Sequence, residues 1–405
     1  MADSRRRLIF LWMYLEWGGA QIYFLAIIKQ AVAEWDVTVI LPRDSARDIV
    51  GYVRHTGAQL EFLESSLDVG PAPTLRRKLH RHISRFKAER ESLKHLRKYD
   101  LKDCVLHVET APWQSWQFLT LLLLRGAHVF VTLHNALPNA AGWREFIWRA
   151  RMRFLSRFAG FHIFASNHDT KNKFRTFVTD RFWKTIPVTY TCVNPIEIEA
   201  AVKVDMDIAA LRSRFGIQGS LVVFCAGQFI DRKGRWVFLD AAKKVSDKRA
   251  DISFVWLSPT MPSAVDQQKI ETYGLGERFK LITAASLGRD RADILRFYRL
   301  ADVFALASFV EGLPISLLEA MALKLPSIST NISAIPEAVY HGENGILIPP
   351  GDANALTEAI ILLATNPELR DRLSEKGSRD VLAKFDERAA SRIALDHYTA
   401  CFHDG

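Results

Sequence analysis

Two glutamates eight positions apart offer the clearest chemistry in the chain. Residues 308–326 read S-F-V-E-G-L-P-I-S-L-L-E-A-M-A-L-K-L-P, a segment that contains Glu311 and Glu319. Gly312 permits close backbone approach, and Pro314 suits the first turn of a helix, where its missing N–H is not needed. Free backbone N–H groups and the helix dipole at such a start favour a bound phosphate. Because carboxylates can hold hydroxyl groups, the segment suits a nucleotide sugar.

An ordinary amphipathic helix with two solvated acids is the alternative for this segment. The apolar stripe of the expected helix consists of Leu317, Leu318, Met321 and Ala322. Glu319 lies off that stripe, while Lys324 and the following Leu-Pro pair close the helix. Both interpretations predict a helix that begins near Pro314, and they differ in whether the two glutamates are solvated.

A glycine-bounded basic loop forms a second motif. Residues 227–234 read G-Q-F-I-D-R-K-G and directly follow an apolar strand expected at 221–226. Lys233 can act as a point charge on a pyrophosphate, and the glycines let the backbone stay close to it. The alternative is a basic surface loop without a ligand.

The two motifs resemble those of the retaining glycosyltransferases of family 4, the glycosyl transferases group 1. The resemblance implies that Glu311 binds the hydroxyls of the donor sugar and that Glu319 holds those of the ribose. It also implies that residues 227–234 bind the donor phosphates. Gln228 stands where many members carry arginine, and Arg232 is the residue that can compensate. The expected donor-binding residues are Gly18, Gly19, Gln228, Arg232, Lys233, Gly312, Leu313, Pro314, Ile315 and Glu319.

The first half of the chain offers two weaker features. Gly18 and Gly19 follow a strand expected at 8–15 and resemble the family's N-terminal glycine pair, although such pairs often only make turns. His134 ends a strand expected at 129–133 and matches the position where members carry a histidine near the reacting sugar. A histidine that is simply hydrogen-bonded at a strand end is the alternative. The expected catalytic residues are Glu311, His134 and Lys233.

The order of expected elements indicates a doubly wound α/β architecture. The expected strands cover 8–15, 37–41, 129–133, 161–166, 221–226, 252–257, 279–283, 303–307 and 327–330. The expected helices cover 21–34, 236–245, 352–364, 368–384 and 387–401. Ligands of such sheets bind outside the carboxyl ends of the strands, which is where Glu311 falls. The resemblance implies the GT-B fold, in which two Rossmann-like domains with parallel sheets face a central cleft.

We expect four parts along the chain. Residues 1–195 form an acceptor-side domain, 196–218 a linker, 219–385 a nucleotide-sugar-binding domain, and 386–405 a helix that returns to the first domain. The V-N-P-I turn at 193–196 resembles the family's entry into the linker. Asp205 and Asp207 mimic a metal-binding D-x-D pair, but their place in the linker predicts a solvated loop and no metal site.

Composition indicates the size of the cores and the cellular compartment that we expect for the protein. An apolar content of 49% over 405 residues supports two cores. The four cysteines are scattered without ligand spacing, which predicts neither disulfides nor a zinc site and favours a reducing cytoplasm. The apolar runs at 8–15 and 119–124 are too short to span a bilayer, which takes about 20 residues. We expect a cytoplasmic protein, or one peripheral on the inner face of the membrane.

The formal net charge of +9 is concentrated in two segments. Residues 76–98 carry ten lysines and arginines, and residues 143–158 combine five arginines with two tryptophans and three phenylalanines. Basic residues with apolar anchors suit an anionic membrane, where a lipid-linked acceptor is found. The same aromatics at helical spacing can equally be core. No nucleic-acid motif accompanies the charge, so we expect no nucleic-acid partner.

The resemblance implies a metal-independent hexosyltransferase without a cofactor, whose co-substrate is a UDP- or GDP-sugar. Lys233, Arg232 and the backbone amides of Leu313, Ile315 and Ser316 can stabilise the departing diphosphate. The expected acceptor is a glycan or a lipid-linked glycan of cell-surface polysaccharide synthesis. A nucleotide-sugar epimerase, a sugar-phosphate synthase and a non-catalytic sugar-nucleotide-binding protein are the alternatives.

Overall fold

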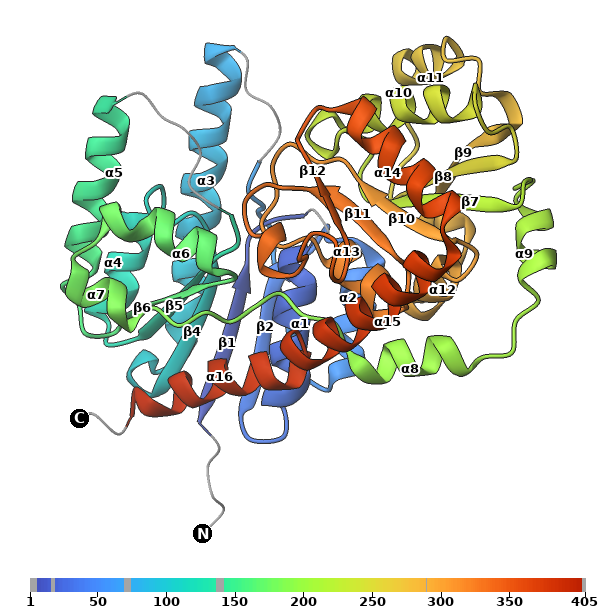
Figure 1. Ribbon diagram of the computed structural model, residues 1–405. Helices are drawn as coiled ribbons and strands as arrows, with labels where there is room; N and C mark the ends of the chain where they lie inside the picture. Colours follow the sequence, from blue (N-terminus) through green and yellow to red (C-terminus); the bar gives the residue numbers. More distant parts are fainter. Residues whose placement is uncertain (1–5, 16–18, 69–73, 136–141, 289, 403–405) are drawn as a thin grey trace. The chain divides into compact units, whose positions relative to one another are not determined.

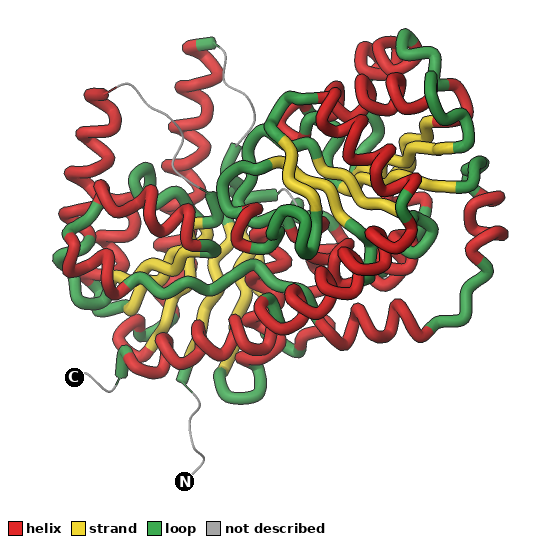
Figure 2. The backbone as a smooth tube through the Cα atoms, in the orientation of Figure 1, coloured by secondary structure: helices red, strands yellow, loops and turns green. Residues whose placement is uncertain are grey.

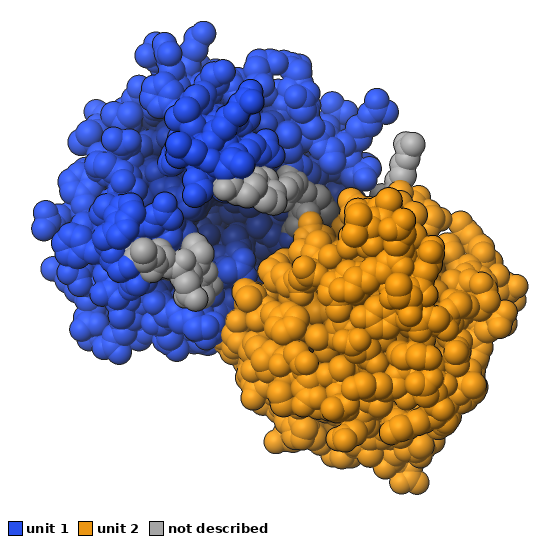
Figure 3. Space-filling view, turned by 90° about the horizontal axis from the view of Figure 1, so that it is seen from above, with its two compact units in different colours: residues 1–191, 388–405 blue, residues 192–387 orange. Residues whose placement is uncertain are grey.

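Two six-stranded parallel sheets, each covered by helices, organise the computed structural model of the chain (Figures 1 and 2). The structure describes residues 6–15, 19–68, 74–135, 142–288 and 290–402. The chain divides into two compact units, shown in two colours in Figure 3. Unit 1 comprises residues 1–191 and 388–405, and unit 2 comprises residues 192–387. The predicted α/β architecture with two Rossmann-like sheets is confirmed.

The sheet of unit 1 has the strand order β3-β2-β1-β4-β5-β6. Its strands are β1 (Arg7–Trp12), β2 (Asp36–Pro42), β3 (Gln59–Leu63), β4 (Cys104–Glu109), β5 (His128–Leu133) and β6 (Phe161–Ala165). Every pairing is parallel, with Leu8 opposite Val37 and Val105. The chain changes direction across the sheet between β1 and β4, so ligands are expected at the carboxyl ends of these two strands.

Helices cover both faces of this sheet. They are α1 (Gly19–Ala31), α2 (Arg47–Thr56), α3 (Leu75–His95), α4 (Trp116–Leu124), α5 (Gly142–Leu155), α6 (His168–Phe174), α7 (Asp180–Thr185) and α16 (Glu387–Ala400). The last helix belongs to the core of unit 1, as expected. Tyr398 is fully buried, and its ring lies 4.8 Å from that of Phe130 and 6.2 Å from that of Trp35.

The sheet of unit 2 has the strand order β12-β11-β10-β7-β8-β9, again all parallel. Its strands are β7 (Leu221–Ala226), β8 (Ile252–Ser258), β9 (Phe279–Thr283), β10 (Val303–Leu306), β11 (Ser327–Thr330) and β12 (Ile346–Ile348). Strands β7 and β10 are neighbours, and the order reverses between them. The two motifs that follow these strands therefore meet at the edge where ligands are expected.

Eight helices of unit 2 are described. They are α8 (Pro195–Lys203), α9 (Ile208–Arg214), α10 (Arg235–Ser246), α11 (Ala264–Glu271), α12 (Arg291–Tyr298), α13 (Ile315–Ala322), α14 (Ala353–Thr365) and α15 (Pro367–Lys384). Short 3₁₀ turns occur at Leu96–Lys98, Leu101–Asp103, Arg175–Phe177, Asp231–Lys233, Gly276–Arg278, Ala284–Ser286 and Ile335–Glu337.

The range 196–218, where we expected a linker, contains most of α8 and all of α9. Asn194 caps α8 with hydrogen bonds from the N–H groups of Ile196 and Glu197. Asp207, from the D-x-D sequence, is exposed and caps α9 by accepting a hydrogen bond of 2.9 Å from the N–H of Ala210. In the parts of the chain that the structure describes, no helix has the length and apolar character needed to span a bilayer.

Candidate active site

The basic loop after β7 is shaped by two glycines with left-handed backbone angles. Gly227 has φ 149° and Gly234 has φ 70°. A Cβ on Gly227 would contact Lys233 Cε at 3.5 Å, so the lysine side chain lies over this glycine. A Cβ on Gly234 would lie 1.8 Å from the carbonyl oxygen of Ala307, which no side chain can accommodate. Glycine at position 234 therefore lets the loop lie against the end of β10.

Lys233 and Glu311 form the central contact of unit 2. Lys233 Nζ lies 2.6 Å from Glu311 Oε1, and Ser308 Oγ donates a hydrogen bond of 2.7 Å to the same oxygen. Arg232 Nη1 lies 3.6 Å from Glu311 Oε2. The glutamate is only 6% exposed, which excludes the solvated acid of the alternative interpretation. Two cations and a hydroxyl group therefore lie against a carboxylate that is almost completely removed from solvent.

The residues that follow Glu311 in the glutamate segment lead directly into helix α13. Gly312, Leu313 and Pro314 are buried, while Ile315 is partly exposed. Helix α13 begins at Ile315, one residue later than a proline in the first turn would require, because Pro314 has an extended ψ of 120°. The first helical turn leaves the N–H groups of residues 315 and 316 without partners inside the helix. These two N–H groups stand four and five residues after Glu311 in the chain.

Glu319 lies inside α13 and is only 3% exposed, although it stands off the predicted apolar stripe. Its Oε1 forms an ion pair with Arg291, and its Oε2 accepts a hydrogen bond of 3.0 Å from the hydroxyl of Tyr298. Arg291 Nε also lies 3.0 Å from Glu197 Oε2. The two acids raise the pKa of the Arg291 guanidinium above its ordinary value, although burial opposes them.

Sequence reasoning missed the residues that hold Glu319. Arg291 and Tyr298 begin and end α12, seven positions apart along one face. Glu197 comes from α8, in the range where we expected a linker. An arginine and a tyrosine at helical spacing after a strand are too common to single out, so nothing in the sequence pointed to them.

Among the described residues, Gln228 forms no hydrogen bond with Lys233 or Glu311. Its side chain is exposed, and no hydrogen bond of that side chain is found in the part of the chain that the structure describes. The loop around it is held by Trp256, whose Nε1 donates 2.8 Å to the carbonyl of Gly227. Arg235 contributes a second hold with a 2.9 Å hydrogen bond to the carbonyl of Phe229. The position of the family's arginine is thus taken by a polar side chain at the surface.

The carboxyl edge of the unit 1 sheet holds a different set of groups. Gly19 is exposed and opens α1, whereas Gly18 lies outside the described residues. Two residues further on, Gln21 Nε2 donates hydrogen bonds of 3.3 and 3.1 Å to the two carboxyl oxygens of Glu109, the last residue of β4. Burial raises the pKa of Glu109 to about 8, and the bond from Gln21 only partly opposes this shift.

His134 directly follows β5 at the same edge of the unit 1 sheet. Its ring lies 5.2 Å from that of Tyr23 and 5.8 Å from that of Phe24. Its Nε2 is shielded from solvent and has no hydrogen-bond partner among the described residues. Burial lowers the pKa of His134 to about 4, so the imidazole is neutral at pH 7. This ring can exchange a hydrogen bond with a hydroxyl but carries no positive charge.

One group of metal-ligating side chains occurs among the described residues. The ligand atoms of His128, His162 and Cys401 lie within 4.8 Å of one another. His128 and His162 lie near the amino ends of β5 and β6, at the opposite edge of the unit 1 sheet from His134, and Cys401 follows α16. The group is therefore separate from both sets of residues described above. The sequence did not predict it because its members are far apart in the chain.

Comparison with known proteins assigns the chain to a family. Residues 207–380 match the family model of glycosyl transferases group 1, and residues 18–181 match that of the glycosyl transferase 4-like domain. The chain belongs to this glycosyltransferase family, as its E-x7-E segment and basic loop indicated.

Its relatives include a kanosaminyltransferase and a glycosyltransferase of capsular polysaccharide biosynthesis. An α-D-kanosaminyltransferase of Streptomyces kanamyceticus is 27% identical over 45% of this chain and 46% of its own length. The capsular polysaccharide biosynthesis glycosyltransferase CapM of Staphylococcus aureus is 23% identical over 65% of this chain and 68% of its own. The chain thus spans about half the length of the first of these relatives and two thirds of the second.

Solved structures share the whole fold. HepE of Anabaena, in complex with UDP-glucose, superposes with a TM-score of 0.76 at 17% identity, covering 98% of this chain and all of that one. This likeness extends the GT-B architecture to the full length of the chain.

Proposed function

We propose that this protein transfers a sugar from a nucleotide-diphosphate sugar to a hydroxyl of a glycan or a lipid-linked glycan. The observation that carries the proposal is the buried Lys233–Glu311 pair, 2.6 Å apart, in which Glu311 stands four residues before the first turn of α13. Cation and amide donors suit a diphosphate, and a carboxylate suits sugar hydroxyls. Both kinds of group converge where β7 and β10 end, the edge of the sheet at which such ligands bind.

In this proposal the bond between the anomeric carbon and the phosphate oxygen breaks, and the nucleoside diphosphate keeps the electron pair. Lys233, Arg232 and the backbone N–H groups of residues 313, 315 and 316 stabilise the growing negative charge without a metal ion. The acceptor oxygen bonds to the anomeric carbon from the face that the phosphate leaves, so configuration is retained. The acceptor proton passes to the departing phosphate oxygen.

Glu311 acts here as a binding group rather than a nucleophile. Lys233 and Ser308 both bind its Oε1, and Arg232 lies near its Oε2, so the carboxylate is held in one orientation. A fixed carboxylate can accept hydrogen bonds from sugar hydroxyls through its remaining lone pairs. Glu319, held by Arg291 and Tyr298, takes the ribose hydroxyls in the same way.

We assign the acceptor side to unit 1. The pKa of His134 is about 4 and that of Glu109 is about 8, so at pH 7 both side chains are uncharged hydrogen-bonding groups. Neutral groups suit the hydroxyls of a sugar better than they suit a phosphate. UDP- or GDP-sugars are the proposed donors, supported by the UDP-glucose bound to HepE. Cell-surface polysaccharide synthesis is the proposed setting, supported by CapM.

Calorimetric binding of UDP, GDP and ADP to the native protein and to Lys233→Ala tests the donor assignment. One nucleoside diphosphate should bind the native protein, and the variant should bind it at least tenfold more weakly. Anomeric analysis of the product by NMR then tests retention. A protein that epimerises the donor without an acceptor, or that binds it without turnover in the presence of glycan acceptors, would refute transfer.

A further inference from the structure

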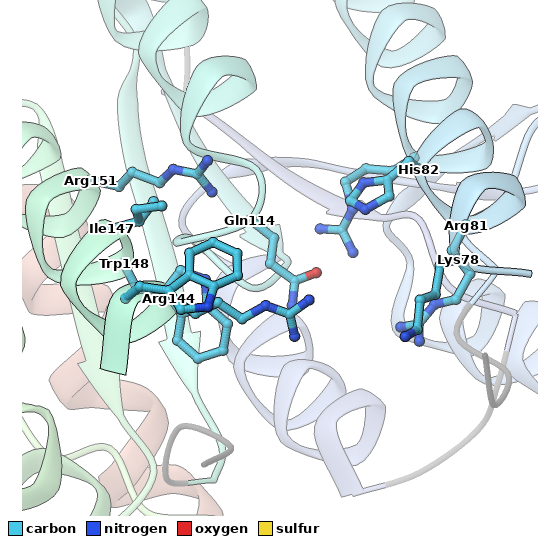
Figure 4. A pocket seen from close by; sticks show the side chains of 10 residues that line it. Lys78, Arg81, His82, Gln114, Arg144, Ile147, Trp148 and Arg151 are labelled. Carbon is cyan, nitrogen blue, oxygen red and sulfur yellow. The ribbon is translucent and has the colours of Figure 1, made fainter. Parts of the chain in front are cut away.

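A cationic cavity in unit 1 lies between α3 and α5, in the two segments that carry most of the excess charge. Its volume is about 480 Å³, and Figure 4 shows its lining from α3 on one side and α5 on the other, with Gln114 between them. The lining residues are Lys78, Arg81, His82, Arg85, Gln114, Trp143, Arg144, Ile147, Trp148 and Arg151. Five of them are permanent cations, and none is acidic.

The five cations of this cavity are not neutralised by neighbouring acids. Within the described residues, none of them forms an ion pair with a carboxylate; Arg81 and Arg151 donate to backbone carbonyls, and Arg85 donates to the hydroxyl of Ser115. Glu89 interacts with Arg85, but burial raises the pKa of its carboxyl group, and it does not line the cavity. A concave surface with one sign of charge concentrates counter-ions, so this cavity suits an anion.

Exposed apolar side chains border the cavity on both helices. On α3, Leu75, Leu79, Ile83 and Phe86 are 84%, 60%, 45% and 66% exposed. On α5, Trp143 is 65% and Phe146 72% exposed. On α3, spacings of three and four residues place the apolar stripe next to the stripe that lines the cavity, and on α5 the exposed Trp143 is itself part of the lining. Of the two alternatives left open for the aromatics of residues 143–158, a place in the core is therefore excluded for Trp143 and Phe146.

The two helices also present their first turns together. Figure 1 shows the amino-terminal turns of α3 and α5 extending past the strands of the unit 1 sheet on the same side. The partial positive charge of each helix start adds to the cationic lining. A dissolved anion would satisfy the cations alone, whereas the headgroup layer of a bilayer meets cations and apolar side chains at once.

We propose that the α3–α5 surface binds an anionic phospholipid membrane, with lipid phosphate groups in the cavity and the bordering apolar side chains inserted among the acyl chains. This inference rests on the proposed function, because a membrane-bound protein would meet a lipid-linked acceptor at that surface. It assigns to Arg81 and Arg144 a role in lipid binding and none in the chemistry of transfer.

Sedimentation with vesicles tests the proposal. The native protein should bind vesicles of mixed phosphatidylcholine and phosphatidylglycerol in low salt, release them in high salt, and ignore pure phosphatidylcholine. The double variant Arg81→Glu, Arg144→Glu should bind roughly a hundredfold more weakly, since each surface cation contributes about a factor of ten or less. The matched control Arg181→Glu, Lys184→Glu reverses two exposed cations of α7 and should bind like the native protein.

A second pair of variants tests the apolar border. Leu79→Ser with Phe146→Ser should weaken binding about tenfold, because less apolar surface is then buried in the bilayer. The control Met261→Ser with Val265→Ser removes two equally exposed apolar side chains of unit 2 and should leave binding unchanged. Equal vesicle binding by either test variant and its control would overturn the proposal for that part of the surface.

Three further outcomes separate this inference from the proposed function. The absence of binding to anionic vesicles in low salt overturns the inference, whatever the protein does with nucleotide sugars. Tighter binding to inorganic diphosphate or to an oligonucleotide than to vesicles overturns it in favour of a soluble anion. A third outcome is that the native protein binds vesicles, the double variant Arg81→Glu, Arg144→Glu does not, and the native protein turns over no donor. This outcome supports the membrane surface and refutes the proposed function.

Discussion

The candidate residues at the carboxyl edges of the two sheets are buried in different electrostatic surroundings. In unit 2, Glu311 and Glu319 are 6% and 3% exposed, and both lie against cations. In unit 1, no described residue sets an opposite charge against Glu109 or His134, and burial shifts both pKa values toward the neutral form. The difference supports the proposed division, in which unit 2 binds the charged donor and unit 1 binds the neutral hydroxyls of the acceptor.

Removal of the cation on the unit 2 side should have the largest effect. Lys233→Ala deletes the group 2.6 Å from Glu311 and should lower kcat/KM for nucleotide release on the order of a thousandfold. Arg232→Ala is the matched control, because this arginine is 43% exposed and lies 3.6 Å from Glu311; its loss should amount to about tenfold. Equal effects from the two substitutions would contradict the central place of Lys233.

Substitution by alanine should destabilise the protein at Gly234 in unit 2 but not at Gly19 in unit 1. Gly234→Ala places a Cβ 1.8 Å from the Ala307 carbonyl at φ 70°, and should lower the free energy of unfolding by about 3 kcal/mol or more. Gly19→Ala meets no atom within 4 Å and should change stability by less than about 0.5 kcal/mol. Thermal unfolding measures both. A stable Gly234→Ala protein would show that the loop does not lie against β10 as described.

Replacing Glu109 by a neutral residue should change how the stability of the protein depends on pH. Its folded pKa of about 8 exceeds the ordinary value of 4.5, so the native state holds a proton that the unfolded state releases, and stability falls as pH rises from 4.5 to 8. Glu109→Gln removes this loss and should be more stable than the native protein by about 1–3 kcal/mol at pH 8, but not at pH 4. Chemical denaturation at both values measures the difference. Asp103→Asn, an exposed acid of the same unit, should show no such dependence.

The smallest effect is expected at His134. Because its pKa is about 4, the imidazole stays neutral from pH 5.5 to 8, and its only contribution is a hydrogen bond. His134→Asn keeps hydrogen-bonding groups and should lower transfer by about tenfold with an unchanged pH profile. A native rate that falls as pH drops through 6.5, and a variant that lacks this fall, would show instead that a charged histidine matters.

The sequence predicted unit 2 better than unit 1 for a physical reason. Strands β7, β9 and β11 begin and end at the expected residues. Strand β7 is a continuous apolar run that is directly followed by Gly227, and Pro326 directly precedes β11. In unit 1, β3 and β4 were not predicted. Strand β3 is exposed at its first residue and lacks a continuous apolar run, and β4 is preceded by a charged helix whose end gives no clear signal.

The candidate site residues were likewise easier to predict in unit 2 than in unit 1. Glu311 and Lys233 could be predicted because each lies in a compact motif directly after a strand. Glu109 also ends a strand, in the sequence H-V-E-T, and an acid at that position is the signal that could have revealed it. Arg291 and Tyr298 could not be predicted, because only the packing of α12 against α13 brings them to Glu319. The exposure of Trp143 and Phe146 likewise depends on which neighbours pack against α5, and a sequence pattern does not name them.

Nucleotide release from a panel of UDP-, GDP- and ADP-sugars tests the central claim most directly, with native protein and Glu311→Ala compared in the presence and absence of a chelator. Circular dichroism of both proteins checks that the fold is intact. We predict release from one donor by the native protein, unchanged by the chelator and almost abolished by Glu311→Ala. Near-normal release by the variant, or release that the chelator abolishes, would contradict a metal-independent donor site built on Lys233 and Glu311.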